Sequence, residues 1–248
     1  MCELLAISGN KKNKIEEIYP NIYLEFRSHS VVHKDGWGIA FYEPRTFNVI
    51  KEAKPAYQSS LSKFMAEYVK SHLIIAHIRK ASHGKVNLRN THPFQRELFG
   101  KSWVFAHNGT VFERPELRNF KLLRYFPIGT TDSELAFCYI LDRLKEKGYK
   151  LPFEQKSNLI IDSIKAIDMG AFGFNFLMSD SVNLYVYRGK HGPTLHYIKL
   201  FNENLNKLII VSSKKLKQVG INKEWIRMRR SQFLTIKEGS ILQDLTLK

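Results

Sequence analysis

Cys2 is the first residue of this sequence whose type and position could do chemistry. Removal of Met1 would leave Cys2 at the N-terminus, carrying both a thiol and a free α-amine. An α-amine has an ordinary pKa of about 7.7–8.0, so near neutral pH it can accept the thiol proton directly or through water. The resulting thiolate is a strong nucleophile. Position 2 therefore suggests an N-terminal nucleophile, and the alternative is a small buried residue at the start of a strand.

A histidine-rich stretch supplies the next polar groups, since five of the nine histidines fall between His72 and His107. Their spacing fits neither a His-x-x-x-His helix pair nor a His-x-His strand pair, so we predict no metal site and no cofactor. The polar residues instead follow apolar, strand-like runs. Side chains at strand ends commonly emerge into a cleft, which predicts a pocket there.

Four residues at these strand and helix ends could bind a substrate with amino-acid groups. Asn108 and Gly109 follow a strand-like run, where the asparagine amide and the glycine N–H could form an oxyanion hole; an ordinary Asn-Gly turn is the alternative. Arg79 follows an apolar run and could bind a carboxylate through its planar guanidinium. Asp132 begins a predicted helix, where it could cap the helix or bind an ammonium group.

Short strands and three helices must position these residues. The helices are expected at 60–70, where apolar residues recur at helical spacing, at 131–147, where Thr131 and Glu134 form a capping box, and at 153–168. Strand composition predicts the following runs: Glu3–Ser8, Gly38–Tyr42, Phe47–Lys51, Leu73–Ile78, Trp103–His107, Gly173–Met178, Val182–Arg188, Thr194–Leu200 and Leu208–Ser213. The order of strands and helices favours a single layered α+β domain over residues 1–248.

Five motifs now combine into a resemblance. Cys2 is followed by Arg79 within His-Ile-Arg-Lys-Ala-Ser-His-Gly, then by Asn-Thr-His-Pro, Ala-His-Asn-Gly and Gly-Thr-Thr-Asp-Ser-Glu. This ordered set resembles the class II glutamine amidotransferases. The opening Met-Cys-Glu-Leu-Leu and the segment His-Lys-Asp-Gly-Trp-Gly are similar to the stand-alone bacterial members. The resemblance covers most of residues 1–188 and implies an N-terminal-nucleophile hydrolase fold, a four-layer αββα sandwich of two antiparallel sheets.

The resemblance also implies a role for each matching residue. Cys2 would attack the γ-amide of glutamine and form a γ-glutamyl thioester, which water would hydrolyse to glutamate. Asn108 and Gly109 would stabilise the oxyanion, and Arg79 and Asp132 would bind the α-carboxylate and the α-ammonium. The remaining pocket residues would be Ser82 and His83 near the carboxylate, His92 without a defined role, and Trp37 on a loop over the nucleophile.

Some residues depart from the family pattern, and the sequence does not identify the molecule that would accept the ammonia. Lys80 stands where many members have tryptophan after the arginine, and no acceptor site is visible, although a synthetase or other acceptor enzyme could be a partner. A γ-glutamyl hydrolase acting on a γ-glutamyl peptide or conjugate is the nearest alternative, because it would use the same thioester. A copy that keeps Met1 would have its amine blocked and should be inactive.

Composition bounds these interpretations. The chain has 248 residues, and its two cysteines, Cys2 and Cys138, cannot build a disulfide framework. The net charge of +16 raises a second alternative, a basic module that binds polyanions. The basic residues are scattered and form no nucleic-acid motif, so we expect no specific nucleic acid. No apolar run is long enough for a membrane helix and the start lacks a secretory pattern, so we expect a cytoplasmic protein that does not bind membranes.

Overall fold

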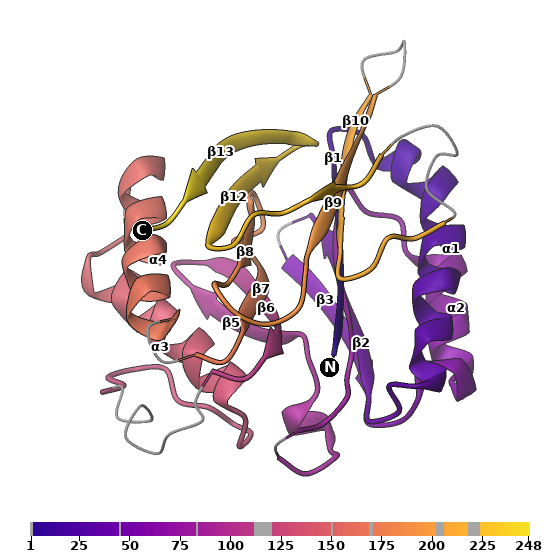
Figure 1. Cartoon of the computed structure of the whole chain (residues 1–248), viewed down its shortest axis with the longest axis horizontal. Helices are drawn as coiled ribbons and strands as arrows, with labels where there is room; N and C mark the ends of the chain where they lie inside the picture. The colour runs from indigo at the N-terminus through magenta and orange to yellow at the C-terminus, as the bar shows by residue number, and fades with distance from the viewer. Residues whose placement is uncertain are drawn as a thin grey trace.

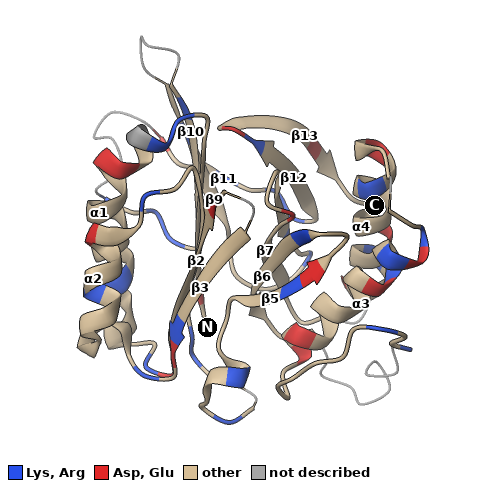
Figure 2. Cartoon of the chain, turned by 180° about the vertical axis from the view of Figure 1, so that it is seen from behind, with Lys and Arg blue, Asp and Glu red and all other residues tan. Residues whose placement is uncertain are grey.

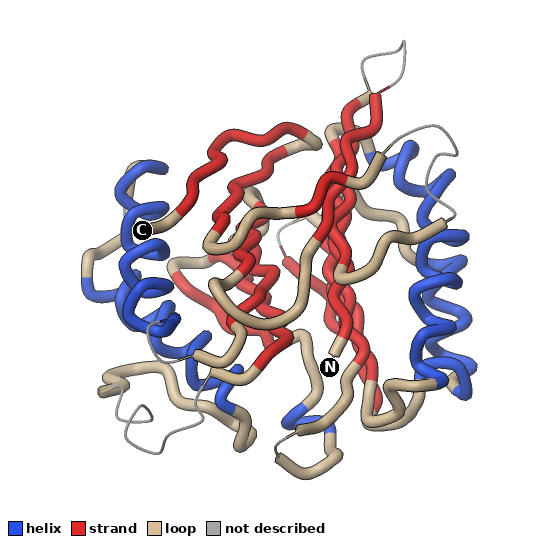
Figure 3. The backbone as a smooth tube through the Cα atoms, in the orientation of Figure 1, coloured by secondary structure: helices blue, strands red, loops and turns tan. Residues whose placement is uncertain are grey.

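The fold is a sandwich of four layers, in which two β-sheets lie between two pairs of helices (Figure 1). The computed structural model describes residues 2–44, 46–82, 84–111, 121–149, 151–168, 171–201, 206–217 and 224–248. Helices cover the outer face of each sheet, and the two sheets face each other in the middle (Figure 3). This arrangement confirms the expected αββα architecture.

The first sheet contains the strand that follows Cys2. All of its strand pairs are antiparallel, and β1 lies at its centre, between β10 and β4. In sheet order the strands are β11 (Ile226–Arg227), β9 (His196–Phe201), β10 (Lys207–Ser212), β1 (Glu3–Gly9), β4 (Leu73–Ile78), β2 (Trp37–Glu43) and β3 (Thr46–Glu52). The start of β1 is therefore held by strand neighbours on both sides.

The second sheet is also antiparallel, and its strand β6 carries Asn108 and Gly109 at its C-terminal end. In sheet order the strands are β13 (Ser240–Thr246), β12 (Gln232–Lys237), β8 (Leu184–Arg188), β7 (Phe174–Ser179), β6 (Lys101–Gly109) and β5 (Phe94–Leu98). Residues 180–183 form the turn between β7 and β8, as the Ser-Asp-Ser sequence predicts.

Four helices form the outer layers: α1 (Lys12–Ser28) and α2 (Ser60–Tyr68) cover the first sheet, whereas α3 (Asp132–Glu146) and α4 (Phe153–Asp168) cover the second. Three single 3₁₀ turns, η1 (His29–Val31), η2 (Ala56–Gln58) and η3 (Leu88–Asn90), lie between strands and helices. The Thr131 hydroxyl accepts a hydrogen bond from the Glu134 N–H, which confirms the predicted N-cap of α3.

Successive side chains of β1 point to opposite faces of the first sheet and pack into two different cores, which holds the layers together. Leu5 and Ile7 face the core under α1 and α2, whereas Leu4 and Ala6 face the core between the sheets. A third core fills the space between the second sheet and α3 and α4. Because both faces of β1 are buried, its residues from Leu4 to Ile7 are all apolar instead of alternating with polar residues.

All nine predicted strands are present in the structure, with ends that differ by two residues or fewer. The three predicted helices are also present, and α4 has the predicted bounds. Helix α1 was not predicted: its apolar residues recur at helical spacing, but Pro20 lies within it and no side chain caps its start. Strands β5, β11, β12 and β13 were also not predicted; β5, β11 and β13 are edge strands, and β12 lies next to β13.

Basic side chains are distributed over helices of both outer layers and over strands of both sheets in the part of the chain that Figure 2 colours. No described helix is both long and apolar enough to cross a membrane.

Candidate active site

Cys2 lies half-buried directly before β1, next to Lys80, the second residue after β4. Its Sγ lies 3.2 Å from both the backbone nitrogen and the carbonyl oxygen of Lys80, so the sulfur accepts one hydrogen bond and the thiol can donate another. Burial raises the pKa of Cys2, and the Lys80 N–H and the Arg79 charge only partly offset this effect. The resting group is therefore a thiol.

Asn108 connects the second sheet to this nucleophile. Its side-chain nitrogen donates hydrogen bonds to the carbonyl oxygen of Cys2 and to the hydroxyl of Ser213, both at 3.0 Å. The Ser213 hydroxyl also accepts the N–H of Leu4 at 2.9 Å, and the Ser213 N–H donates to the Leu4 carbonyl. The amide group is thus held beside the residue that carries the thiol.

Gly109 follows Asn108 and packs against the backbone of a neighbouring segment. Its φ is +130°, and a Cβ at this position would lie 1.9 Å from the carbonyl oxygen of Gly173. Only glycine fits this backbone and this close contact. An amide side chain at Asn108 is therefore followed by a residue whose backbone N–H no side chain covers, which is the combination that an oxyanion hole requires.

Arg79 is buried at the end of β4, and its guanidinium holds the loop that follows. The two terminal nitrogens donate to the carbonyl oxygens of Lys85 and Gly84 at 3.2 and 3.3 Å. Its backbone N–H donates to Gly36, and the Asp35 carboxylate accepts the N–H of Ala81 at 2.8 Å. The segment His33–Gly38 thereby positions Arg79 as well as the loop.

Burial lowers the pKa of Arg79 slightly, although the nearby Cys2 and Asp35 oppose this shift; a guanidinium nevertheless remains charged at neutral pH. Ser82 lies exposed on the same loop, and His83 lies outside the described residues. Of the residues predicted to lie near the substrate carboxylate, Arg79 is therefore fixed by hydrogen bonds. Ser82, three residues later in the chain, is accessible to solvent.

Asp132 is the first residue of α3, and its carboxylate connects that helix to the chain that leaves β6. One oxygen accepts the N–H of Val111 at 2.7 Å, and the other accepts the N–H of Ser133 at 2.8 Å. The Ser133 hydroxyl in turn contacts Nδ1 of His107 at 2.8 Å. Since Val111 follows Gly109 by two residues, Asp132 lies near the strand end that carries Asn108 and Gly109.

Asn90 brings the Arg79 loop to the segment before Asp132. Its amide nitrogen donates to the Lys85 carbonyl at 3.0 Å, and its amide oxygen accepts the N–H of Thr130 at 2.8 Å. Asn90 begins the Asn-Thr-His-Pro motif, so the sequence contained the signal, but no role was predicted for it. The two expected ligands for the α-groups are thus joined through one amide.

His92 is buried in a group of packed rings. Its centroid lies 4.3 Å from that of His77 and 4.4 Å from that of Phe94. Burial lowers the pKa of His92 well below its ordinary value and that of His77 to about 3, so both rings are neutral at pH 7. This environment is that of a packing residue behind the site. Among the described residues, no group of three or more His, Cys, Asp or Glu could hold a metal ion.

Trp37 differs from its expected place. It is the first residue of β2, is 1% exposed and belongs to the core under α1 and α2. Its indole N–H donates to the Glu52 carboxylate at 3.0 Å. The flanking glycines suggested a loop over the nucleophile, but the apolar ring instead fills the space beneath the helices, so that expectation was wrong.

Glu3 was missed by the sequence analysis. Its buried carboxylate contacts His29 Nδ1 at 2.6 Å and His33 Nε2 at 3.0 Å, and it pairs with Lys214. Burial alone would raise the pKa of Glu3, but hydrogen bonds from His29 and Lys214 lower it overall. The available signal was an acid at the start of an otherwise apolar strand, because a buried carboxylate needs cationic or donor partners.

The comparisons with known proteins agree with this geometry. The family model described as "Glutamine amidotransferases class-II" matches residues 1–203. YafJ of Escherichia coli K12, a predicted glutamine amidotransferase, is 37% identical over 202 residues, which cover 80% of this chain and 76% of YafJ. A predicted glutamine amidotransferase of Haemophilus influenzae is 33% identical over 269 residues, which cover 99% of this chain and 87% of the relative.

Solved structures show the same fold. A predicted glutamine amidotransferase from Pseudomonas aeruginosa superposes with a TM-score of 0.71 at 27% identity, over 98% of this chain and 100% of that one. The glutamine phosphoribosylpyrophosphate amidotransferase of B. subtilis gives 0.71 at 15% identity, over 100% of this chain and 49% of that one. The second likeness concerns the fold alone and supports the N-terminal-nucleophile hydrolase architecture.

Proposed function

Because this chain belongs to the class II glutamine amidotransferases, we propose that its Cys2 thiol hydrolyses the γ-amide of glutamine to glutamate and ammonia. The observation that carries the proposal is the contact between Asn108 and Cys2. It holds a side-chain amide donor next to the residue with the nucleophilic sulfur, across the two sheets. The proposed reaction is an acyl transfer to sulfur and then to water.

In the first half of the reaction, the sulfur forms a bond to the γ-carbonyl carbon of glutamine. The thiol proton passes to the α-amine of Cys2, which is free once Met1 is removed. The raised pKa of Cys2 makes this transfer necessary, because little thiolate exists before attack. The carbonyl oxygen becomes an oxyanion, which Asn108 and the backbone N–H of Gly109 stabilise.

Collapse of the tetrahedral intermediate breaks the bond between carbon and nitrogen. The ammonium form of the Cys2 amine returns the proton, so ammonia departs and a γ-glutamyl thioester remains. Water then attacks the thioester carbon, with the same amine as base, and the thiol leaves with a proton. Glutamine and water are thereby converted to glutamate and ammonia, with Cys2 regenerated.

Arg79 and Asp132 are proposed to select the substrate through its α-groups. The guanidinium of Arg79 would bind the α-carboxylate, because its planar fork can donate two parallel hydrogen bonds to one carboxylate. Asp132 would bind the α-ammonium while keeping its contacts with Val111 and Ser133. A carboxylate has four lone-pair sites, so two backbone donors do not exhaust it.

The test uses enzyme whose intact mass shows that Met1 is absent. With glutamine as substrate, we expect equal amounts of glutamate and ammonia from the wild type and none from Cys2→Ala. Cys138→Ala is the matched control, because this buried cysteine lies on α3. Ammonia release by Cys2→Ala at the wild-type rate would contradict the proposal.

One observation favours a substrate with a larger leaving group, as in a γ-glutamyl peptide or conjugate. Val86 and Leu88 are 50% and 53% exposed on the loop that Arg79 holds. Exposed apolar side chains at the edge of a site can contact an apolar leaving amine. A panel of γ-glutamyl amides compared by kcat/KM tests this: a clear preference for glutamine would exclude it, and a preference for γ-glutamyl conjugates would replace the glutaminase assignment.

We also propose that a separate synthetase or other acceptor enzyme uses the ammonia released at this site and is a partner of this protein. Glutamine hydrolysis that accelerates when such an enzyme and its acceptor are present would support it.

A further inference from the structure

A cavity of about 240 Å³ lies on the helix-covered side of the second sheet. Its walls come from the β5–β6 hairpin, from the end of α3 and from the start of α4. Cys2 instead belongs to the first sheet, so this cavity is separate from the active site and the inference does not rest on the proposed function. A cavity of about 150 Å³ is enough for benzene, so this one admits a somewhat larger molecule.

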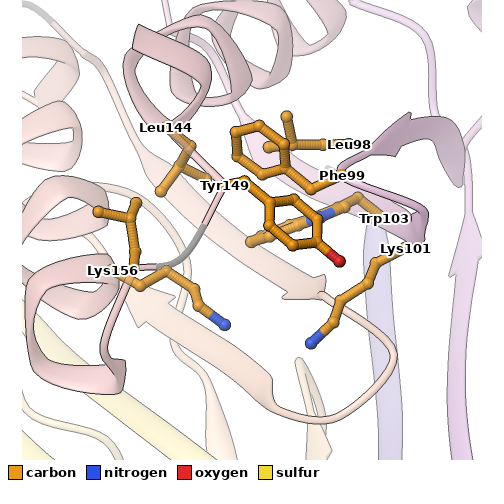
Figure 4. A pocket seen from close by; sticks show the side chains of 8 residues that line it. Leu98, Phe99, Lys101, Trp103, Leu144, Tyr149 and Lys156 are labelled. Carbon is orange, nitrogen blue, oxygen red and sulfur yellow. The ribbon is translucent and has the colours of Figure 1, made fainter. Parts of the chain in front are cut away.

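Aromatic rings form the inner wall of the cavity (Figure 4). Phe99 and Tyr149 meet edge to face, with ring centroids 5.5 Å apart and an interplanar angle of 86°. Trp103 stacks on Tyr185 at an interplanar angle of 6°, which fixes the orientation of its indole. Leu98 and Leu144 complete an apolar lining. Flat rings among apolar side chains favour a planar, apolar ligand body.

Two features of this wall are not explained by packing alone. Phe99 has a φ of +55°, a conformation that bulky residues rarely adopt and that hairpin turns usually assign to glycine or asparagine. The indole nitrogen of Trp103 is buried and has no hydrogen-bond partner among the described residues. The two-residue turn Phe99–Gly100 accounts for the positive φ, as Glu238–Gly239 does in the β12–β13 hairpin. The unpaired indole donor has no such explanation, and a ligand with an acceptor group could use it.

Two lysines stand at the same side of the cavity, and Figure 4 shows both amino groups beyond the aromatic rings. Lys156 Nζ lies 2.6 Å from the carboxylate of Asp180, a buried residue, so that charge is already neutralised. Lys101 forms no ion pair with the described residues and is exposed. Lys145 Nζ also lies over the Phe99 ring, 4.6 Å from its centroid. Lys101 and Lys145 thus place positive charge beside the aromatic rings, which suits a ligand with a negative charge.

We propose that this cavity binds a small aromatic monocarboxylate. Its ring lies among Phe99, Trp103 and Tyr149, and its carboxylate lies at Lys101. The indole N–H of Trp103 supplies a donor for any acceptor on the ring side. No residue of this cavity belongs to the active site described above.

The test compares 3-(4-hydroxyphenyl)propionate with the uncharged 3-(4-hydroxyphenyl)propanamide, which has nearly the same shape and the same ring hydroxyl as an acceptor for the Trp103 N–H. Binding is followed by ligand-observed NMR and by tryptophan fluorescence of the full chain. We expect the wild type to bind the acid about five- to tenfold more tightly than the amide, as one partly exposed charge contact allows. Equal affinity for the two compounds, or binding of neither, would overturn the proposal.

Three variants locate the site. Lys101→Met should remove the preference for the acid. Lys165→Met is the control, because it deletes an exposed charge in the last turn of α4, which does not line the cavity. Leu151→Trp should fill the cavity and abolish binding of both compounds, and its melting temperature shows whether it is folded. Retention of the acid preference in Lys101→Met, or wild-type binding by folded Leu151→Trp, would refute the assignment.

Discussion

The side-chain amide of Asn108 donates a hydrogen bond to the carbonyl oxygen of Cys2 at 3.0 Å, and this contact joins the two sheets at the nucleophile. The same amide also donates to Ser213, so both of its protons are used in the free protein. A developing oxyanion must therefore take one donor from an existing acceptor. Because an oxyanion is a stronger acceptor than a neutral carbonyl or hydroxyl, this exchange favours the transition state over the ground state.

Asn108→Ala should lower kcat for glutamine by about 10²–10³-fold, the usual effect of removing one oxyanion donor. The KM should change much less, since the bond forms with the transition state. Ser213→Ala is a useful comparison: it removes the second acceptor of the amide but leaves the donor in place, and it should retain most of kcat. Steady-state kinetics that show equal losses in the two variants would argue against the oxyanion role.

The two cysteines should differ sharply in reactivity. Burial raises the pKa of Cys138 to about 12, so at pH 8 its thiolate is scarce and its sulfur is enclosed. Cys2 is half-buried, and its pKa is also raised, so its alkylation should accelerate as pH rises above about 8.5. Mass spectrometry after iodoacetamide treatment should find one label on Cys2, reduced by excess glutamine, and modification of Cys138 first would contradict this expectation.

Glu3 should stabilise the start of β1 through its contacts with His29, His33 and Lys214. Its pKa is lower in the folded protein than the ordinary value of about 4.3. The unfolded chain therefore binds the proton first, and the contribution is complete above about pH 5 and declines as pH falls through the folded pKa. Glu3→Gln should cost about 1–3 kcal/mol of unfolding free energy at pH 7.

Urea unfolding of the wild type and of Glu3→Gln at pH 7, 5 and 3.5 tests this pH dependence. The difference between the two proteins should be smaller at pH 3.5 than at pH 7. A larger difference at pH 3.5 would show that the carboxylate is not the stabilising group. At pH 5 His33 also contributes to the difference, because burial lowers its pKa while the Glu3 charge opposes that shift in the wild type only.

Gly109→Ala should destabilise the fold by about 2 kcal/mol or more. The added Cβ meets the carbonyl oxygen of Gly173, a backbone atom that cannot rotate away, at a φ of +130°. Gly100→Ala is the matched control: its φ is +68°, but no atom lies within 4 Å of the new Cβ, so about 1 kcal/mol is expected. Denaturant midpoints that rank the two variants in the opposite order would contradict the packing argument.

Local patterns made much of the fold predictable, and contacts between distant residues account for what was missed. Strand β4 has its predicted bounds because Leu73–Ile78 is apolar and is followed by a polar loop. Helix α1 was not predicted because Pro20 and a basic first turn are unfavourable signals for a helix. Its apolar stripe is stabilised by packing on the first sheet, a contact that the local sequence does not reveal. Strands β12 and β13 join the second sheet at the end opposite β5, and more than 130 residues separate them from β5 in the sequence.

The site shows the same division. Cys2 and Asn108 were predicted as site residues from type and position, and the Asn108 amide donates a hydrogen bond to the Cys2 carbonyl oxygen. The partners of Glu3 come from residues 29, 33 and 214, a combination that no local spacing reveals. Trp37 was misplaced because flanking glycines are typical of loops, although here the residue begins a strand and its ring is buried.

Asp132→Asn separates ligand binding from helix capping. The variant keeps the size of the side chain and one acceptor oxygen, but it loses the charge that would pair with the α-ammonium of glutamine. We expect KM to rise at least about tenfold, since a charged hydrogen bond contributes about 1.5–3 kcal/mol. Asp142→Asn is the control on the same helix, because its carboxylate also accepts backbone N–H groups, those of Leu123, Arg124 and Tyr125. Both variants should lose stability, but only Asp132→Asn should raise KM; equal KM values would reduce Asp132 to a structural anchor.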